Sequence, residues 1–248
     1  MRPDVTDLHE FYGTPLGQRM RRALLRRIRE IWPNLAGQRL LGLGYAVPYF
    51  RPFSEETERV LALMPASQGV MHWPREGPNL TALVDETELP LADYSIDRVL
   101  LVHCLETAEP SGPLLREIWR VLAPGGRILV VVPNRSGLWT RFEHTPFGQG
   151  RPYSQSQLSR LLRDNDFSPL LSASAVFLPP SHRRTLLRMA PAFERFGRRW
   201  GNRVAGVILA EAVKQVYAVT PLAAQRRRRR RLMPAIRPVP ATRGRIES

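Results

Sequence analysis

The 248-residue sequence carries 37 basic and 22 acidic side chains, which give a formal net charge of +15. This length is sufficient for one substantial α/β domain with an ordinary core. The single cysteine, Cys104, excludes an internal disulfide and a cysteine-rich zinc site. No apolar run approaches the ~20 residues that cross a bilayer, and the first residues lack the apolar core of a signal peptide. We therefore expect a cytoplasmic protein without a membrane span.

Apolar segments and turn signals divide the chain into helices and strands. Leu16, Met20, Leu24 and Ile28 recur at helical spacing and predict a helix over 16–32. Further helices are expected at 114–122, 156–164 and 181–199, with Pro191 near the middle of the last, and at most a short one opens at Ser54. The predicted strands are 38–43, 60–64, 80–84, 98–102, 127–132, 170–177 and 207–217. This alternation predicts an α/β fold: a doubly wound, Rossmann-like sheet of seven mostly parallel strands with flanking helices.

The end of the chain differs from the rest in composition. Six consecutive arginines, Arg226 to Arg231, repel one another and stay solvated, and a proline-rich segment follows them. We expect one folded domain over 1–222 and a disordered basic tail over 223–248. Such a tail can hold nucleic acid or anionic lipid through sequence-independent contacts. A solubilising or merely tolerated tail is the alternative.

Segment 40–46 has the pattern of a strand that ends in a glycine-rich turn. In doubly wound folds such glycines let a nucleotide-like cofactor approach the backbone, and the helix that follows offers free N–H donors. Gly42 and Gly44 occupy these positions, while the third position of the pattern is Ala46 and no acid precedes the turn. The pattern predicts a turn that once held, or still holds, a cofactor.

Four segments resemble, in order and spacing, the class I S-adenosylmethionine-dependent methyltransferases, and most closely the type 11 group that includes ubiquinone and menaquinone methyltransferases. The glycine turn stands in the position of the family's first motif. Residues 85–99 resemble the signature after the third strand, 117–133 the helix–turn–fifth-strand block, and 207–215 the terminal strand. The resemblance covers about residues 6–220. It implies the class I methyltransferase fold and methyl transfer to an unidentified acceptor.

The resemblance also implies a cofactor site. S-adenosylmethionine would lie over Gly42, Gly44 and Ala46, and Asp85 matches the position whose carboxylate contacts the adenine amino group, with the Glu86 backbone beside it. The alternative for Asp85 is an acid that caps its own turn.

His103 stands where the family places residues that face the substrate, and is a candidate for the cofactor site and for catalysis. The alternative is a core or rim histidine without a chemical role. Cys104 is expected to be a small buried apolar residue.

Two positions depart from the family pattern. Functional members usually carry an acid two residues before the first glycine, where this sequence has Leu40. They usually carry a second acid at the end of the second strand for the ribose hydroxyls, where this sequence has Met64 and Pro65. Leaving those hydroxyls without a charged acceptor costs about 2–3 kcal/mol, a tenfold to hundredfold loss of affinity.

The loop 133–153 resembles the segment that closes over substrate in type 11 enzymes. His144 in this loop is the second candidate for catalysis, as a base for an acceptor hydroxyl or amine; a surface histidine is the alternative. Methyl transfer itself needs mainly positioning and desolvation, because the sulfonium is already activated. The sequence shows no metal-ligand constellation.

The leading interpretation is a methyltransferase that uses S-adenosylmethionine, with binding weakened by Leu40 and Met64. The first alternative is a catalytically inactive protein of the same fold that serves as a partner or regulatory subunit. The second is an RNA-associated methyltransferase guided by the basic tail. The tail offers no interleaved aromatic residues that could stack on bases.

Overall fold

The computed structural model describes residues 3–142, 145–181, 184–190, 192–194, 197 and 204–216. The expected tail 223–248, with its arginine run, and the candidate His144 lie outside the described residues. Within the described residues, no helix is long and apolar enough to cross a bilayer.

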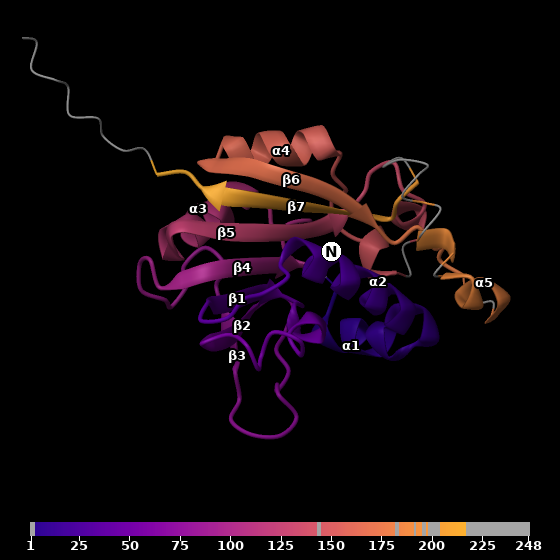
Figure 1. Ribbon diagram of the computed structural model, residues 1–248, viewed down its shortest axis with the longest axis horizontal. Helices are drawn as coiled ribbons and strands as arrows, with labels where there is room; N and C mark the ends of the chain where they lie inside the picture. Colours follow the sequence, from indigo (N-terminus) through magenta and orange to yellow (C-terminus); the bar gives the residue numbers. More distant parts are fainter. Residues whose placement is uncertain are drawn as a thin grey trace, which may run out of the picture. The chain divides into compact units, whose positions relative to one another are not determined.

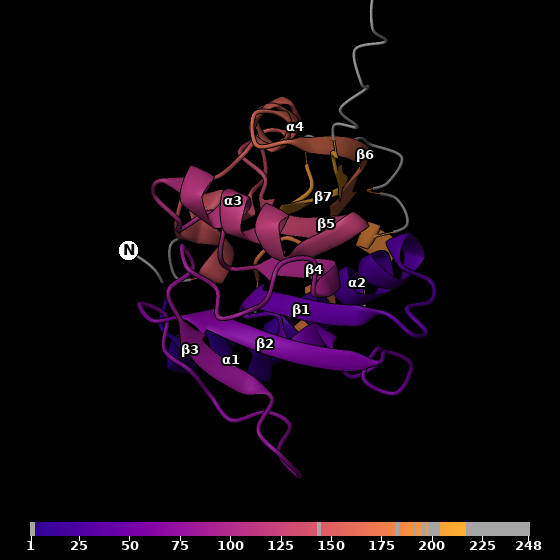
Figure 2. The same cartoon turned by 90° about the vertical axis from the view of Figure 1, so that its left-hand side faces the viewer.

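One seven-stranded sheet forms the centre of the protein, in the order β3-β2-β1-β4-β5-β7-β6. Figure 2 shows the strands in this order from the bottom of the view to the top. Strand β7 runs antiparallel to both of its neighbours, and all other neighbours pair in parallel. The strands are β1 (Arg39–Gly44), β2 (Arg59–Pro65), β3 (Thr81–Val84), β4 (Ile96–Val102), β5 (Leu122–Pro133), β6 (Phe167–Ala175) and β7 (Val207–Lys214). The predicted α/β, doubly wound, mostly parallel sheet is confirmed.

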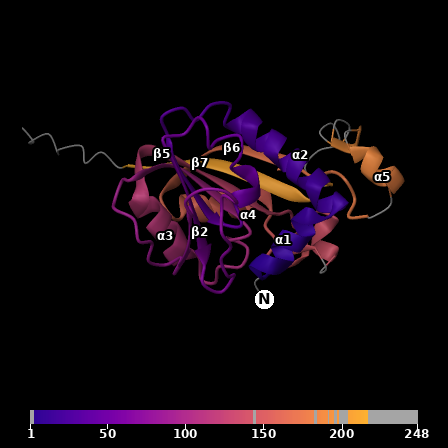
Figure 3. The ribbon, with the colours of Figure 1, turned by 90° about the horizontal axis from the view of Figure 1, so that it is seen from below.

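The α-helices cover both faces of the sheet. The N-terminal hairpin of α1 (Val5–Gly13) and α2 (Pro15–Ile31) packs on one face, and α3 (Ser111–Val121) and α4 (Gln155–Arg163) pack on the other. Figures 1 and 3 show α1 and α2 side by side. Alternate residues of the central strands face the two cores: Leu40 and Leu100 pack toward the hairpin, and Leu41 and Leu101 toward α3. This alternation is the period of two that a strand buried on both faces requires.

Local capping explains where several helices begin. Asp4 accepts a hydrogen bond from the Thr6 amide and caps α1, which the sequence pattern had not predicted. Ser154 and Gln157 form a reciprocal capping box at the start of α4. The predicted helices 16–32, 114–122 and 156–164 agree with α2, α3 and α4 within a few residues.

The short helix at Ser54 is not formed, while the helix expected over 181–199 is present in the residues described there. Ser54 opens no helix: its hydroxyl donates to the Arg51 carbonyl within a series of turns, and the only helical piece between β1 and β2 is the 3-10 turn η1 (Val47–Tyr49). Within the range 181–199, the described residues include α5 (Arg184–Arg188), a turn at Met189 and further helical residues at 190, 192–194 and 197, in agreement with the expected helix. Pro191 lies outside the described residues; a proline there has no N–H to donate to the preceding turn.

Candidate functional site

The glycine turn follows the end of β1, at the point where the strand order reverses between β1 and β4. In open α/β sheets this switch point is the usual position of a ligand crevice. Gly44 adopts a φ of 77°, and a Cβ there would lie 2.3 Å from the Val102 carbonyl oxygen. The Tyr45 amide donates to that same oxygen at 2.8 Å. The residue that follows β1 is therefore hydrogen-bonded directly to the end of β4.

Gly42 faces the protein's own side chains. A Cβ at this position would lie 2.2 Å from Cζ of Phe50 and 2.6 Å from Cβ of Ala46. Phe50 and Ala46 are both completely buried, and they come from the segment in which the family pattern places the start of a helix. Residues 41–47 are all buried. The turn therefore presents almost no open backbone to a ligand.

His103, at the end of β4, is a completely buried residue with a φ of 52°. Its Nε2 lies 3.0 Å from the Tyr12 hydroxyl, which lies 2.8 Å from the Tyr49 hydroxyl. Its Nδ1 lies 3.3 Å from Oε1 of Glu106 but outside hydrogen-bonding alignment, and its ring centroid is 4.4 Å from that of Phe147. His103 is thus enclosed by protein groups, as the alternative of a core histidine predicts.

Gln68 links the segments that follow β2 and β4. It follows β2, and its Nε2 donates to the carbonyl of His103, which follows β4, at 2.9 Å. Because β1 lies between β2 and β4, this side chain passes across the end of β1. The backbone carbonyl of Gln68 also accepts a hydrogen bond from the amide of Val5 at 2.7 Å and so anchors the start of α1. We call Tyr12, Tyr49, Gln68, His103 and Glu106 the switch-point cluster; all five are buried.

The tyrosines in and beside this cluster stay protonated near neutral pH. Burial raises the pKa of Tyr12 and of Tyr49, and it raises the pKa of Tyr45 to about 12. Their hydroxyls can therefore donate and accept hydrogen bonds, but none is a ready base.

The two positions that lack the family's acids hold core side chains. Leu40 and Met64 are buried and belong to the hydrophobic cluster under α1 and α2. A carboxylate at either position would need a partner inside that cluster. Their apolar character is thus explained by packing.

Asp85 is exposed at the end of β3 and caps its own turn. Its Oδ1 accepts from the Thr87 amide at 2.8 Å and from the Thr87 hydroxyl at 2.6 Å. These hydrogen bonds lower the pKa of Asp85, the hydroxyl having the larger effect. The neighbouring Glu86 is half-buried. The side-chain hydrogen bonds of Asp85 lie within its own turn.

Among the described residues, two cavities of several hundred Å³ open beyond the same carboxyl edge of the sheet. The arginine pocket, about 390 Å³, lies between the α1–α2 hairpin and the loops after β1 and β2. It is lined by His9, Tyr12, Gly13, Arg21, Tyr45, Val47, Pro48, Arg51, Met71, His72, Trp73 and Arg75.

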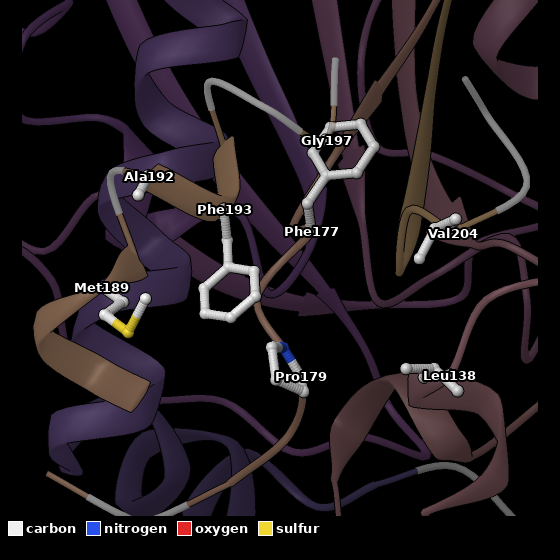
Figure 4. A pocket seen from close by; sticks show the side chains of 8 residues that line it. All are labelled: Leu138, Phe177, Pro179, Met189, Ala192, Phe193, Gly197 and Val204. Atoms are coloured by element: carbon white, nitrogen blue, oxygen red, sulfur yellow. The ribbon is translucent and has the colours of Figure 1, made fainter. Parts of the chain in front are cut away.

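The apolar pocket, about 430 Å³, lies beyond the ends of β5 and β6 and is lined almost entirely by carbon. Figure 4 shows Leu138 and Val204 on one side of it, and Met189 and Phe193 on the other. The remaining lining residues are Phe177, Pro179, Ala192 and Gly197.

Sequence reasoning found the turn but missed what surrounds it. Tyr12 and Gln68 lie outside every motif, and only the density of aromatic residues in 45–53 could have signalled a filled site. Cys104 is buried, as predicted. Among the described residues, no group of three or more histidine, cysteine, aspartate or glutamate side chains could hold a metal ion.

A sheet of order 3-2-1-4-5-7-6 with an antiparallel seventh strand and helices on both faces is the class I methyltransferase fold. Residues 41–130 match the family described as "Methyltransferase domain". The resemblance to the type 11 branch of S-adenosylmethionine-dependent methyltransferases is therefore confirmed. A search of curated proteins finds no sequence match.

Solved structures support the same fold at low sequence identity. A possible histamine N-methyltransferase from Thermotoga maritima is 16% identical, with a TM-score of 0.59 over 85% of this chain and 96% of the other. A methyltransferase from Mesorhizobium loti is 16% identical, with a TM-score of 0.55 over 76% and 96%. A chain from the complex of the Haloferax volcanii Trm112 methyltransferase activator with a putative methyltransferase is 18% identical, with a TM-score of 0.54 over 74% and 85%.

The residues at the switch point do not fit S-adenosylmethionine held in the manner of this family. The backbone from Gly42 to Ala46 is buried, and Gln68 crosses the end of β1. The side chain of Leu40 has no acceptor atom, and the thioether of Met64 is only a weak acceptor for a hydrogen bond from the cofactor. The fold of the family is present, while the surface that carries its cofactor is closed.

Proposed function

We propose that this protein keeps the methyltransferase fold but not S-adenosylmethionine-dependent turnover, and that it acts by binding a ligand or partner. The observation that carries the proposal is the hydrogen bond from Gln68 across β1 to the His103 carbonyl, made between two completely buried residues. A cofactor placed over the glycine turn would have to displace Gln68 and α1. It would also leave buried polar groups without partners, which is expensive in a low-dielectric interior.

Charge supports the same proposal. S-adenosylmethionine carries a sulfonium, an ammonium and one carboxylate, and is a net cation. The open space nearest the turn is lined by three arginines and two histidines, and no acid lines it. The family's ribose-binding acid is replaced by Met64. A cation is therefore disfavoured on both counts.

A methyltransferase with weak cofactor binding is the second candidate, and the exposed carboxylate of Asp85 favours it. In this case α1 must move away from the switch point. Asp85 and the Glu86 backbone would then hold the adenine, and Gly42, Gly44 and Ala46 the methionine moiety. His103 or His144 would lie near the transferred methyl.

Calorimetric titration of the full chain with S-adenosylmethionine and S-adenosylhomocysteine separates the two candidates. We expect no binding up to millimolar ligand by protein whose circular dichroism shows it folded. Asp85→Ala is the informative variant, because Asp85 is exposed and contacts only its own turn. Micromolar binding by the natural chain, weakened in Asp85→Ala, would overturn the proposal and support the adenine assignment.

A role as a partner subunit is one form that binding without turnover can take. The Haloferax volcanii structure pairs a protein of this fold with the Trm112 activator, which supports such a role without identifying the partner of this chain. An RNA-associated role rests on Arg226 to Arg231, outside the described residues, and stays a prediction. Loss of RNA affinity and of its salt dependence on truncation at Ala224 would support it.

A further inference from the structure

The arginine pocket combines a cationic rim with an aromatic floor. Arg21 comes from α2, Arg51 from the turns after η1, and Arg75 from the loop between β2 and β3. His9 and His72 complete the rim. Segments distant in sequence thus place five nitrogen-bearing side chains around one cavity of about 390 Å³, a volume within the usual range for a small-molecule site.

The three arginines of the rim have no acidic partner. In the part of the chain that the structure describes, no ion pair or side-chain hydrogen bond is made by the guanidinium of Arg21, Arg51 or Arg75. Other surface arginines do pair: Arg29 meets Glu56 at 2.6 Å, and Arg39 meets Asp97 at 2.9 Å. Because no acid lines the pocket, the positive potential of its rim is not cancelled locally.

The floor offers a surface for a flat ring. Trp73 is half-buried and packs edge-on against Phe50, with the ring centroids 5.3 Å apart. Tyr45 holds its ring in place with its hydroxyl 3.4 Å from Nδ1 of His9. Tyr12 and Met71 complete this part of the lining. Aromatic faces of this kind stack on planar ligands in a way that tolerates different rings.

We infer that the arginine pocket binds a small anion that carries a planar ring, of the class of nucleoside monophosphates. Guanidinium groups match phosphate oxygens in geometry as well as charge, and the half-buried Trp73 supplies the stacking face for the base. The inference is independent of whether the protein methylates anything. Adenosine 5′-monophosphate and S-adenosylmethionine share an adenosine group. The group attached to it is negatively charged in the first and positively charged in the second, so the charge of the pocket distinguishes the two ligands.

The test is calorimetric titration of the full chain with adenosine 5′-monophosphate. Two control ligands match it: adenosine, which lacks the phosphate, and inorganic phosphate, which lacks the ring. We expect the nucleotide to bind about tenfold or more tightly than either match, since each lacks one half of the recognition. Affinity should fall as salt is raised, because the rim is exposed. S-adenosylmethionine, run in parallel, should not compete.

Two variants locate the binding. Arg51→Gln and Arg75→Gln should each weaken the nucleotide about tenfold. Arg59→Gln, at an exposed position at the opposite end of β2, is the matched control and should bind as the natural chain does. Both pocket arginines are exposed, so these substitutions leave the core intact.

The inference is overturned by no nucleotide binding up to millimolar, by equal affinity for adenosine and its monophosphate, or by an equal effect of Arg59→Gln. Failure of the proposed function is a different result, namely tight binding of S-adenosylmethionine. Inorganic phosphate that binds as tightly as the nucleotide would also overturn the inference, because it would remove the role of the aromatic floor.

Discussion

The two ends of the sheet's carboxyl edge are built in opposite ways. Beyond β1 and β4, polar and aromatic side chains of the switch-point cluster fill the space and bond to one another. Beyond β5 and β6, the apolar pocket stays open at about 430 Å³, with carbon on nearly every side. The first end is the switch point, where open α/β sheets usually bind ligands. The strand order thus leaves the position of open space to be decided by the side chains.

The polar side chains of the switch-point cluster hydrogen-bond to one another, whereas the side chains that line the apolar pocket cannot. Tyr12, Gln68 and His103 each make a hydrogen bond to another element, although Gln68 Oε1, His103 Nδ1 and Glu106 Oε1 are buried without one. The walls of the apolar pocket have no such directional partners, and only contact between their surfaces would close it. At the first end the space directly over the glycine turn is therefore filled and the arginine pocket lies beside it, while the second end is free to accept an apolar group.

The largest effect is expected from removing the centre of the switch-point cluster. Tyr12→Ala should lower the free energy of unfolding by about 3–5 kcal/mol, because it leaves a ring-sized cavity and strips His103 and Tyr49 of their shared partner. Urea denaturation measures this. Tyr12→Phe, which keeps the ring, should cost only about 1 kcal/mol. Equal effects of the two variants would contradict the packing described for this end.

A smaller loss is expected at the glycine turn. Gly42→Ala should cost about 1–3 kcal/mol, because its Cβ would overlap Phe50 and Ala46. Adding Phe50→Leu should restore part of the lost stability, because it removes the ring atom that the new Cβ would overlap. Gly13→Ala is the matched control, since no atom lies within 4 Å of its Cβ. If Gly42→Ala cost no more stability than this control, the space at the turn would be open, contrary to the packing described for it.

The smallest effect on stability is expected at the apolar pocket. Leu138 is 40% exposed, so Leu138→Asn should change the free energy of unfolding by no more than about 0.5 kcal/mol. The same change should weaken binding of the neutral dye N-phenyl-1-naphthylamine about fivefold, through lost apolar contact. Leu170→Asn, at an exposed position on β6, is the control. A dye signal that both variants reduce equally would place the binding elsewhere.

Local patterns predicted the sheet well, and the reason is visible in its residues. All seven strands were expected within a few residues of their ends, although β5 begins at Leu122 rather than at Arg127. Helix α1 was missed because its nine residues carry little periodicity beyond the cap at Asp4.

The candidate site was predictable in position but not in content. Gly42 and Gly44 were identified from the motif, and the structure shows that Gly42 is required by Phe50 and Gly44 by Val102. Asp85 was assigned to an adenine or to its own turn. Within the protein alone it caps the turn, while the adenine contact remains a prediction.

The sequence by itself determined the strands, the helices α2, α3 and α4, the buried stripes, and the membership of a methyltransferase fold, because all of these follow from the local spacing of apolar and turn residues. Only the tertiary structure decided what occupies the end of β1. Tyr12 and His103 are 91 residues apart and Gln68 and His103 are 35 apart, yet they meet over one strand. Such contacts depend on the three-dimensional path of the chain, and they decide whether a familiar turn is open to a cofactor or closed.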